Sequence, residues 1–308
     1  MASPAKGALR CTLVRVKRLQ TPPAVARLVP FVAAVTLLAA CEREPPPPAV
    51  RTFTGPTMGT TYQVTVAGTG ADETRGRPVQ RCIDHVLARV DRHLSAYSKA
   101  SELTALNANG STDWVRISDP VYAVLAAAQR VSVETNGAFD VTIAPLVRLW
   151  GFGPDARRGE DRAAAGVPAP EFVHDAAAIS GYTWLELRST PAPGLRKGRT
   201  PLELDVDGIA PGYAVDRISG CLARAGFTQH LVEIGGEVRA AGTRADGEPW
   251  RVAIERPLAG ERVAQVGLAL RDLAVSTSGN YRDFRRLEDG RVVSHTIDPR
   301  TGEPVRHT

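Results

Sequence analysis

The chain has 308 residues, 43% of them hydrophobic and 6% aromatic, which is enough for one large domain or two smaller ones with an apolar core. Its formal charge of +5 is unevenly placed, because residues 1–40 carry six Lys or Arg and no acidic residue. The rest of the chain carries 32 basic and 33 acidic side chains, without a basic stripe interleaved with aromatic residues. This distribution excludes nucleic acid as a partner and assigns the positive charge to a targeting segment.

The first predicted element is a signal segment. The apolar run from Leu28 to Ala40 is too short for an ordinary bilayer span but has the length of a signal-peptide core. It ends in LAAC, which resembles the bacterial lipobox and implies cleavage before Cys41 and a lipid on the thiol of Cys41. A plain cleaved signal with an incidental cysteine is the alternative. We expect residues 1–40 to be a lipoprotein signal peptide, and the protein to be a periplasm-facing lipoprotein anchored to a membrane of the bacterial cell envelope.

A short spacer is predicted next, over residues 41–52. It contains four consecutive prolines, which favour an extended polyproline conformation. We expect this linker to hold the domain that follows, residues 53–308, away from the membrane.

The first elements predicted for this domain are one strand and two helices. Polar and apolar residues alternate over 60–68, which predicts a strand. Apolar residues recur at helical spacing over 78–97, which predicts an amphipathic helix. A second helix is expected to end at Val131, with Asp119 as its N-cap and Pro120 as its first residue.

The second half of the domain is predicted to be rich in strands. Residues 151–180 are rich in Gly, Ala, Pro and charge and indicate a surface excursion. Strands are then predicted at 184–188, 202–206, 230–240, 250–255 and 264–270, with one helix at 212–226. Because strands and helices do not alternate in a regular βαβ order, the pattern predicts an α+β fold rather than a doubly wound sheet.

Two cysteines follow Cys41 in the sequence, Cys82 and Cys221. In an oxidising compartment they could pair. Both lie on apolar faces of predicted helices, where buried free cysteines are common, so we expect free thiols and keep the disulfide as the alternative.

Five glycine-rich or polar clusters interrupt the segments that predict a core. They are residues 58–61, 94–103, 137–154, 205–213 and 276–302. Small residues with exposed N–H groups allow a backbone to approach an anion closely, and aromatic side chains offer a face to a flat ring. Carboxylates in these clusters could accept hydrogen bonds from ring or ribose donors, or help to hold a cation. His295 titrates near neutral pH and could move a proton. Taken singly, His295 and Asp205 also fit plainer roles as a strand residue and a helix cap.

Taken in order, the sequences of these clusters resemble one family, the ApbE family of FAD:protein FMN transferases. The matching stretches include TMGTTYQV, GAFDVTIAPLVRLWGFG, LDVDGIAPGYAVD, STSGNYRDF and VSHTIDPRTGEPV, and they extend over residues 53–308. The resemblance implies an ApbE-like (T-fold-like) α+β architecture of mixed sheets with flanking helices.

The resemblance also implies an activity. Such proteins use FAD as a substrate and a divalent cation, usually Mg²⁺, to transfer FMN onto a Thr or Ser hydroxyl of a target protein, with release of AMP. The implied partner is a periplasm-facing flavin-accepting protein. Two alternatives stay open: an FAD pyrophosphatase that yields FMN and AMP, and a flavin-binding lipoprotein without catalysis.

The resemblance assigns roles to individual residues. The implied flavin-binding positions are Met58, Tyr97, Ala138, Phe139, Asp140, Asp205 and Ile297. Gly208 is implied to give its backbone carbonyl to the metal, and His295 is the implied base. Pro211 stands where relatives often have Lys or Glu, and Asn280 stands where Asp is frequent. The side-chain metal ligands of the family lie in a segment beyond the last motif, so we expect the metal site to be incomplete in residues 53–308.

Overall fold

The computed structural model describes residues 49–68, 76–154, 166–258 and 263–306. The predicted signal segment, Cys41 and most of the predicted linker lie outside these ranges, and the first strand begins at Val50, inside the predicted linker. None of the helices within the described ranges combines the length and the apolar character that a bilayer crossing requires.

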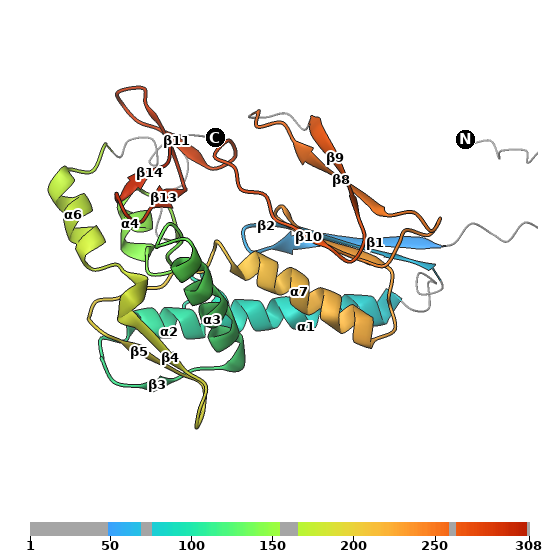
Figure 1. Cartoon of the computed structure of the whole chain (residues 1–308), viewed down its shortest axis with the longest axis horizontal. Helices are drawn as coiled ribbons and strands as arrows, with labels where there is room; N and C mark the ends of the chain where they lie inside the picture. The colour runs from blue at the N-terminus through green and yellow to red at the C-terminus, as the bar shows by residue number, and fades with distance from the viewer. Residues whose placement is uncertain (1–48, 69–75, 155–165, 259–262, 307–308) are drawn as a thin grey trace, which may run out of the picture. The chain divides into compact units, whose positions relative to one another are not determined.

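A five-stranded antiparallel sheet carries one side of the candidate site, with strand order β1-β2-β6-β7-β10 (Figure 1). Its strands are β1 (Val50–Thr57), β2 (Thr60–Ala67), β6 (His230–Ile234), β7 (Glu237–Ala241) and β10 (Ala274–Val275). A glycine pair separates β6 from β7, with φ angles of 59° at Gly235 and 109° at Gly236. The single run predicted at 230–240 is therefore two strands, because only glycine adopts these positive φ angles without strain.

Two helices cover this sheet, α1 (Gly76–Leu94) and α7 (Ala210–Arg224) (Figure 1). They contact each other, and α7 packs on β6 and β7. Their buried residues recur at helical spacing, such as Ile83 and Val90 on α1 and Ile218 and Leu222 on α7. Burial of these apolar stripes confirms the two helices predicted from periodicity.

A disulfide joins the two helices, between Cys82 of α1 and Cys221 of α7. The expectation of free thiols is therefore wrong. Both cysteines do lie on apolar helical faces, but packing of α1 against α7 brings those faces together and places the two Cα atoms 5.7 Å apart, within the range that a disulfide spans.

The remaining helices and strands form smaller layers around this unit. The helices are α2 (Glu102–Ala108), α3 (Asp119–Glu134), α4 (Ala144–Leu149) and α6 (Pro170–Ala178). The small sheets are β3-β5-β4 (Val115–Arg116, Gly194–Lys197, Leu185–Arg188), β8-β9 (Trp250–Glu255, Ala264–Leu270), β11-β12 (Phe284–Arg286, Val292–Ser294) and β13-β14 (Ile297–Asp298, Glu303–Pro304). The N-cap of α3 is Ser118, whose Oγ accepts from the Val121 amide at 3.4 Å, so the assignment of Asp119 as the cap is corrected by one residue. Helices and antiparallel sheets together confirm the α+β class.

The surface excursion predicted at 151–180 contains part of a core. Phe152 is 2% exposed and packs in a cluster with Leu146, Trp150 and Ile297, and α6 packs on α4. Residues 155–165 lie outside the described ranges. The described remainder contradicts the prediction, because aromatic and aliphatic side chains between the polar residues supply enough apolar surface to bury.

The strand predicted at 202–206 pairs with no other strand in the described ranges. Leu204 is buried, as the alternation indicated, but its backbone is held by a side chain: its N–H donates to Asn107 Oδ1 and its carbonyl accepts from Asn107 Nδ2, both at 2.8 Å. The next amide, of Asp205, donates to the Val141 carbonyl at 2.7 Å. An amide side chain thus replaces the neighbouring strand and satisfies the buried backbone.

His230 is a fully buried histidine at the start of β6. Its Nδ1 lies 2.8 Å from the Phe227 carbonyl, which only accepts, so Nδ1 carries the hydrogen. Its Nε2 then accepts from the hydroxyl of Ser219 on α7, at 2.8 Å. Burial lowers the pKa of His230 below its ordinary value, so this histidine is a neutral link between β6 and α7.

The free energy of unfolding is expected to fall as the pH falls below about 6.5, the ordinary pKa of histidine. Above that pH both states are neutral, whereas below it the unfolded chain takes up a proton that the folded His230 resists. The contribution is at most about 1.4 kcal/mol per pH unit for one proton. Urea unfolding at several pH values should show a shallower slope for His230→Asn, and an unchanged slope for the control His85→Asn on the exposed face of α1. Equal slopes for the wild type and His230→Asn would contradict the prediction.

Candidate functional site

A pocket of about 400 Å³ opens between the β1–β2 turn, the end of α1 and the start of α7. Met58 sits in the turn in a left-handed conformation with φ 47°, followed by Gly59 with φ 73°, so its side chain is partly exposed. Tyr97 follows α1, and Asp207 precedes α7. The pocket is lined by Pro56, Thr57, Met58, Leu87, Ala88, Asp91, Ser95, Tyr97, Asp207 and Pro211. Two predicted flavin-binding positions, Met58 and Tyr97, are therefore brought together.

The tyrosine in this pocket keeps its proton. The ring of Tyr97 is 58% exposed, whereas its hydroxyl group is directed at Asp207 and donates to Oδ2 at 3.4 Å. Desolvation of this hydroxyl, together with the negative charges of Asp207 and Asp205, raises the pKa of Tyr97 to about 12. The phenol is thus a neutral donor at physiological pH, and its exposed face is available to an aromatic ligand.

Two carboxylates lie beside this tyrosine. The amide of Asp207 donates to Asp205 Oδ1 at 2.9 Å. Desolvation and the charge of Asp205 raise the pKa of Asp207 to about 7. Desolvation also raises the pKa of Asp205, although the Asp207 amide and the imidazole of His295 partly offset this effect. The electrostatic contact with His295 links the carboxylates to the opposite wall of the site.

His295 comes directly after β12 and is exposed. Its Nδ1 lies 3.0 Å from the backbone carbonyl of Asp283, and because a carbonyl only accepts, Nδ1 carries the hydrogen. The ring of Phe152 meets the imidazole edge-on, with centroids 6.4 Å apart. The hydrogen bond and the aromatic contact fix the ring and leave Nε2 as an unprotonated acceptor, the form that a general base requires.

The segment 138–140 divides into an exposed and a buried part. Ala138 is exposed and Phe139 is half-buried, whereas Asp140 is buried. Phe139 lies close to Gly208: a Cβ atom at Gly208 would approach its ring to 3.3 Å. The absence of a side chain at Gly208 therefore keeps the backbone of this residue accessible beside the phenyl ring.

Both carboxylate oxygens of Asp140 are used inside the protein. Oδ1 accepts from the Thr142 amide at 2.8 Å and from the Thr142 hydroxyl at 2.7 Å, and Oδ2 accepts from the Tyr182 amide at 2.8 Å. Ile297 is likewise occupied, because it is 6% exposed and packs in the cluster that contains Trp150. The structure thus brings Met58, Tyr97, Asp205 and His295 to one site, and places Asp140 and Ile297 behind it as packing and anchoring residues.

Within the described residues, no group of three or more His, Cys, Asp or Glu side chains is arranged to hold a metal ion. The groups nearest to such a role are the carboxylates of Asp205 and Asp207 and the backbone of Gly208. Mg²⁺ usually binds through one or two carboxylates together with substrate phosphates. Two adjacent carboxylates whose proximity raises the pKa of one of them fit a cation of this kind, so the residues present are compatible with Mg²⁺ held jointly with a phosphate group.

Two further pocket residues, Asp91 and Ser95, were not predicted from the sequence. Asp91 lies on α1 and Ser95 directly follows it, so the two share one side of the helix four residues apart. A polar pair on one side of a helix otherwise patterned for burial was the signal that could have identified them.

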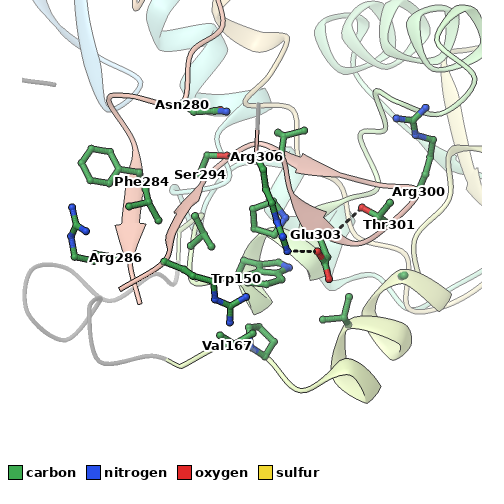
Figure 2. Close-up of a pocket in the computed structure, with 18 of the residues that line it drawn as sticks. Trp150, Val167, Asn280, Phe284, Arg286, Ser294, Arg300, Thr301, Glu303 and Arg306 are labelled. Atoms are coloured by element: carbon green, nitrogen blue, oxygen red, sulfur yellow. Dashed lines mark hydrogen bonds and ion pairs between the residues drawn. The ribbon is translucent and has the colours of Figure 1, made fainter. Parts of the chain in front are cut away.

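A second, larger cavity of about 1050 Å³ lies beyond His295, between β8, β11, β12, β14 and α6 (Figure 2). Ser294, immediately before His295, lines it. Asn280 also lines it and accepts from the hydroxyl of Thr296, immediately after His295, at 3.0 Å. His295 therefore stands between the two cavities along the chain, with the carboxylate pair on one side and the larger cavity on the other.

Comparison with known proteins gives a consistent result. The ApbE family profile matches residues 58–308. The FAD:protein FMN transferase of Vibrio cholerae serotype O1 is 38% identical over 277 residues, which cover 89% of this chain and 78% of that protein. The FAD:protein FMN transferase of Haemophilus influenzae is 36% identical over 279 residues, covering 90% and 78%.

Solved structures agree. The flavin transferase ApbE from Vibrio cholerae superposes with a TM-score of 0.73 at 38% identity and covers 85% of this chain and 80% of its own. Apo flavinyl transferase ApbE from Pseudomonas stutzeri gives a TM-score of 0.72 at 37% identity, covering 84% and 77%. This chain belongs to the ApbE family.

Proposed function

We propose that the chain transfers FMN from FAD onto a Thr or Ser hydroxyl of an acceptor protein and releases AMP. The observation that carries this proposal is the state of His295, an exposed imidazole whose Nδ1–H is bound to a backbone carbonyl and whose Nε2 is free to accept a proton. Membership of the ApbE family and the names of the relatives support the same reaction.

The chemistry assigned to His295 follows from the substrate. The acceptor oxygen forms a bond to the phosphorus of the FMN half, and the bond from that phosphorus to the bridging oxygen of the pyrophosphate breaks, so AMP leaves with the bridging oxygen. A neutral hydroxyl is a poor nucleophile, and Nε2 of His295 takes its proton as the new bond forms. The Asp205 carboxylate, within electrostatic range of His295, stabilises the imidazolium that results.

The pocket at Met58 and Tyr97 is proposed to receive FAD. The exposed face of Tyr97 and the flexible thioether of Met58 suit a flat ring system. Asp205, Asp207 and the carbonyl of Gly208 would hold Mg²⁺, which would offset the charge of the pyrophosphate. The protonated Tyr97 hydroxyl, bound to Asp207, keeps this carboxylate in position.

The test uses the purified full chain with FAD, Mg²⁺ and an acceptor protein that carries one reactive threonine. We expect the acceptor to gain the mass of an FMN group and to become fluorescent on a denaturing gel, with one AMP released for each group transferred. Release of AMP and free FMN without labelling would identify an FAD pyrophosphatase. FAD binding without either product would identify a flavin-binding protein and contradict the proposed reaction.

We further propose that Cys41 is the lipid-modified N-terminus of the mature protein and anchors it to a membrane, with the domain facing the periplasm. The support is the LAAC motif after a short apolar run, together with a disulfide between Cys82 and Cys221, which is typical of an oxidising compartment. Cys41→Ser is expected to move the protein to the soluble periplasmic fraction or to block its processing. Unchanged membrane retention and an unchanged mature mass would contradict the proposal; Cys11→Ser is the matched control.

A further inference from the structure

The larger cavity beside His295 has an apolar floor and an apolar rim. Its floor includes Trp150, whose indole N–H donates to the Gly302 carbonyl at 2.7 Å, and Val293, which is 9% exposed. Its rim includes Phe284 and Val292, which are 38% and 53% exposed. Figure 2 shows Phe284 on one side of the cavity and Trp150 at its middle. We call this cavity the β11–α6 groove. Exposed apolar side chains around a concave surface indicate a binding site rather than a packed core.

The charge of the groove is positive. Four arginines line it, Arg286, Arg291, Arg300 and Arg306, against one glutamate, Glu303. Three of these arginines pair with carboxylates close in sequence: Arg291 with Asp289, Arg300 with Asp298 and Arg306 with Glu303.

Arg286 differs from the other three arginines. It is exposed at the end of β11 and makes no ion pair with any described residue. Figure 2 shows it on the same side of the groove as Phe284. An unpaired guanidinium beside apolar side chains is suited to bind a carboxylate, because the neighbouring apolar surface limits access of water.

The position of the groove relates it to the proposed reaction. Ser294 and Asn280, which line it, adjoin His295 through the chain and through the bond to Thr296. The pocket at Met58 and Tyr97 shares no lining residue with the groove. A transfer reaction needs room for two substrates, one on each side of the base, and the proposed FAD pocket accounts for only one of them.

We propose that the β11–α6 groove binds the acceptor protein, and that it selects a segment in which apolar residues and at least one carboxylate flank the reactive Thr or Ser. The proposal rests on the proposed transferase function. The apolar floor takes the apolar residues of the segment, Arg286 binds the carboxylate, and the hydroxyl is presented toward His295. Charge complementarity and continuity with His295 favour a protein segment over other occupants.

The test compares two synthetic peptides with one threonine in an apolar stretch, one flanked by glutamates and the other by lysines at the same positions. We expect the glutamate peptide to be labelled with FMN at a higher kcat/KM. Arg286→Glu should lower kcat/KM for the glutamate peptide about tenfold and raise it for the lysine peptide, since reversing a charge at an interface replaces attraction by repulsion. Phe284→Ala should lower kcat/KM for both peptides.

The control variant is Arg116→Glu, an exposed arginine of β3 that does not line the groove, and it should leave both peptides unchanged. FAD affinity, measured by titration, should stay within about twofold in every variant, because the FAD pocket shares no residue with the groove. FMN transfer that Arg286→Glu and Phe284→Ala leave unchanged for both peptides would overturn the docking proposal and leave the proposed function standing. Failure of the wild-type protein to label either peptide or a threonine-bearing protein, although it binds FAD, would overturn the proposed function and this inference with it.

Discussion

Replacement of His295 by alanine is expected to lower the rate of FMN transfer about 10²–10⁴-fold, the contribution typical of a general base. FAD affinity should change little, because His295 is exposed and lines neither the Met58–Tyr97 pocket nor the core. Single-turnover labelling of a threonine-bearing acceptor, with FAD titration alongside, measures both quantities.

A second variant separates proton transfer from positioning. His295→Asn keeps a side-chain N–H that is able to donate to the Asp283 carbonyl, but it has no nitrogen that can take a proton. We expect it to be as inactive as the alanine variant while keeping its melting temperature. The control is His85→Ala on the exposed face of α1, which should transfer FMN at the wild-type rate. Near-normal transfer by either folded His295 variant would remove His295 from the mechanism.

Removal of the disulfide is expected to lower the free energy of unfolding by about 3–5 kcal/mol. The bond joins residues 139 positions apart in sequence, so in the unfolded chain it restricts a very long loop. Urea unfolding of the Cys82→Ala/Cys221→Ala double variant, compared with the oxidised wild type, measures the effect.

Reductant supplies the matched control for this experiment. It should destabilise the wild type nearly to the level of the double variant and leave the double variant unchanged. Peptide mapping of the non-reduced protein should recover the two cysteines as a linked pair. Equal stability of the oxidised and reduced wild type would show that the bond does not constrain the native protein.

The elements predicted best from sequence are those whose stability depends on one amphipathic face. The helix predicted at 78–97 is α1, with ends within three residues, because its apolar stripe specifies both the helix and the side that it buries. The segment at 202–206 carries a strand-like alternation too, yet its backbone partner is the side chain of Asn107, far away in sequence. Local periodicity predicts burial, but it does not identify the group that satisfies the backbone.

The same limit applies to the candidate site. Motif order placed Met58, Tyr97, Asp205 and His295 in one site, because polar residues that interrupt core-forming segments are commonly found at functional sites. The motifs could not show that the carboxylate of Asp140 is occupied by the amides of residues 142 and 182, since that depends on the packing of a segment distant in sequence. The disulfide escaped prediction for the same reason, because which helices pack together is decided by the tertiary fold.

The order of strands in the five-stranded sheet has a consequence for how the chain folds. Strand β2 is bonded along one edge to β1, its neighbour in sequence, and along the other edge to β6, with Tyr62 opposite Ile234. The β1–β2 hairpin can therefore form early, but the apolar face and the open edge of β2 stay unpaired until residues 230–234 have been synthesised. Closing so long a loop makes folding slow, and an open edge strand invites pairing with other chains in the interval. A nascent chain released before residue 234 is thus expected to aggregate, whereas one released after it can close the sheet.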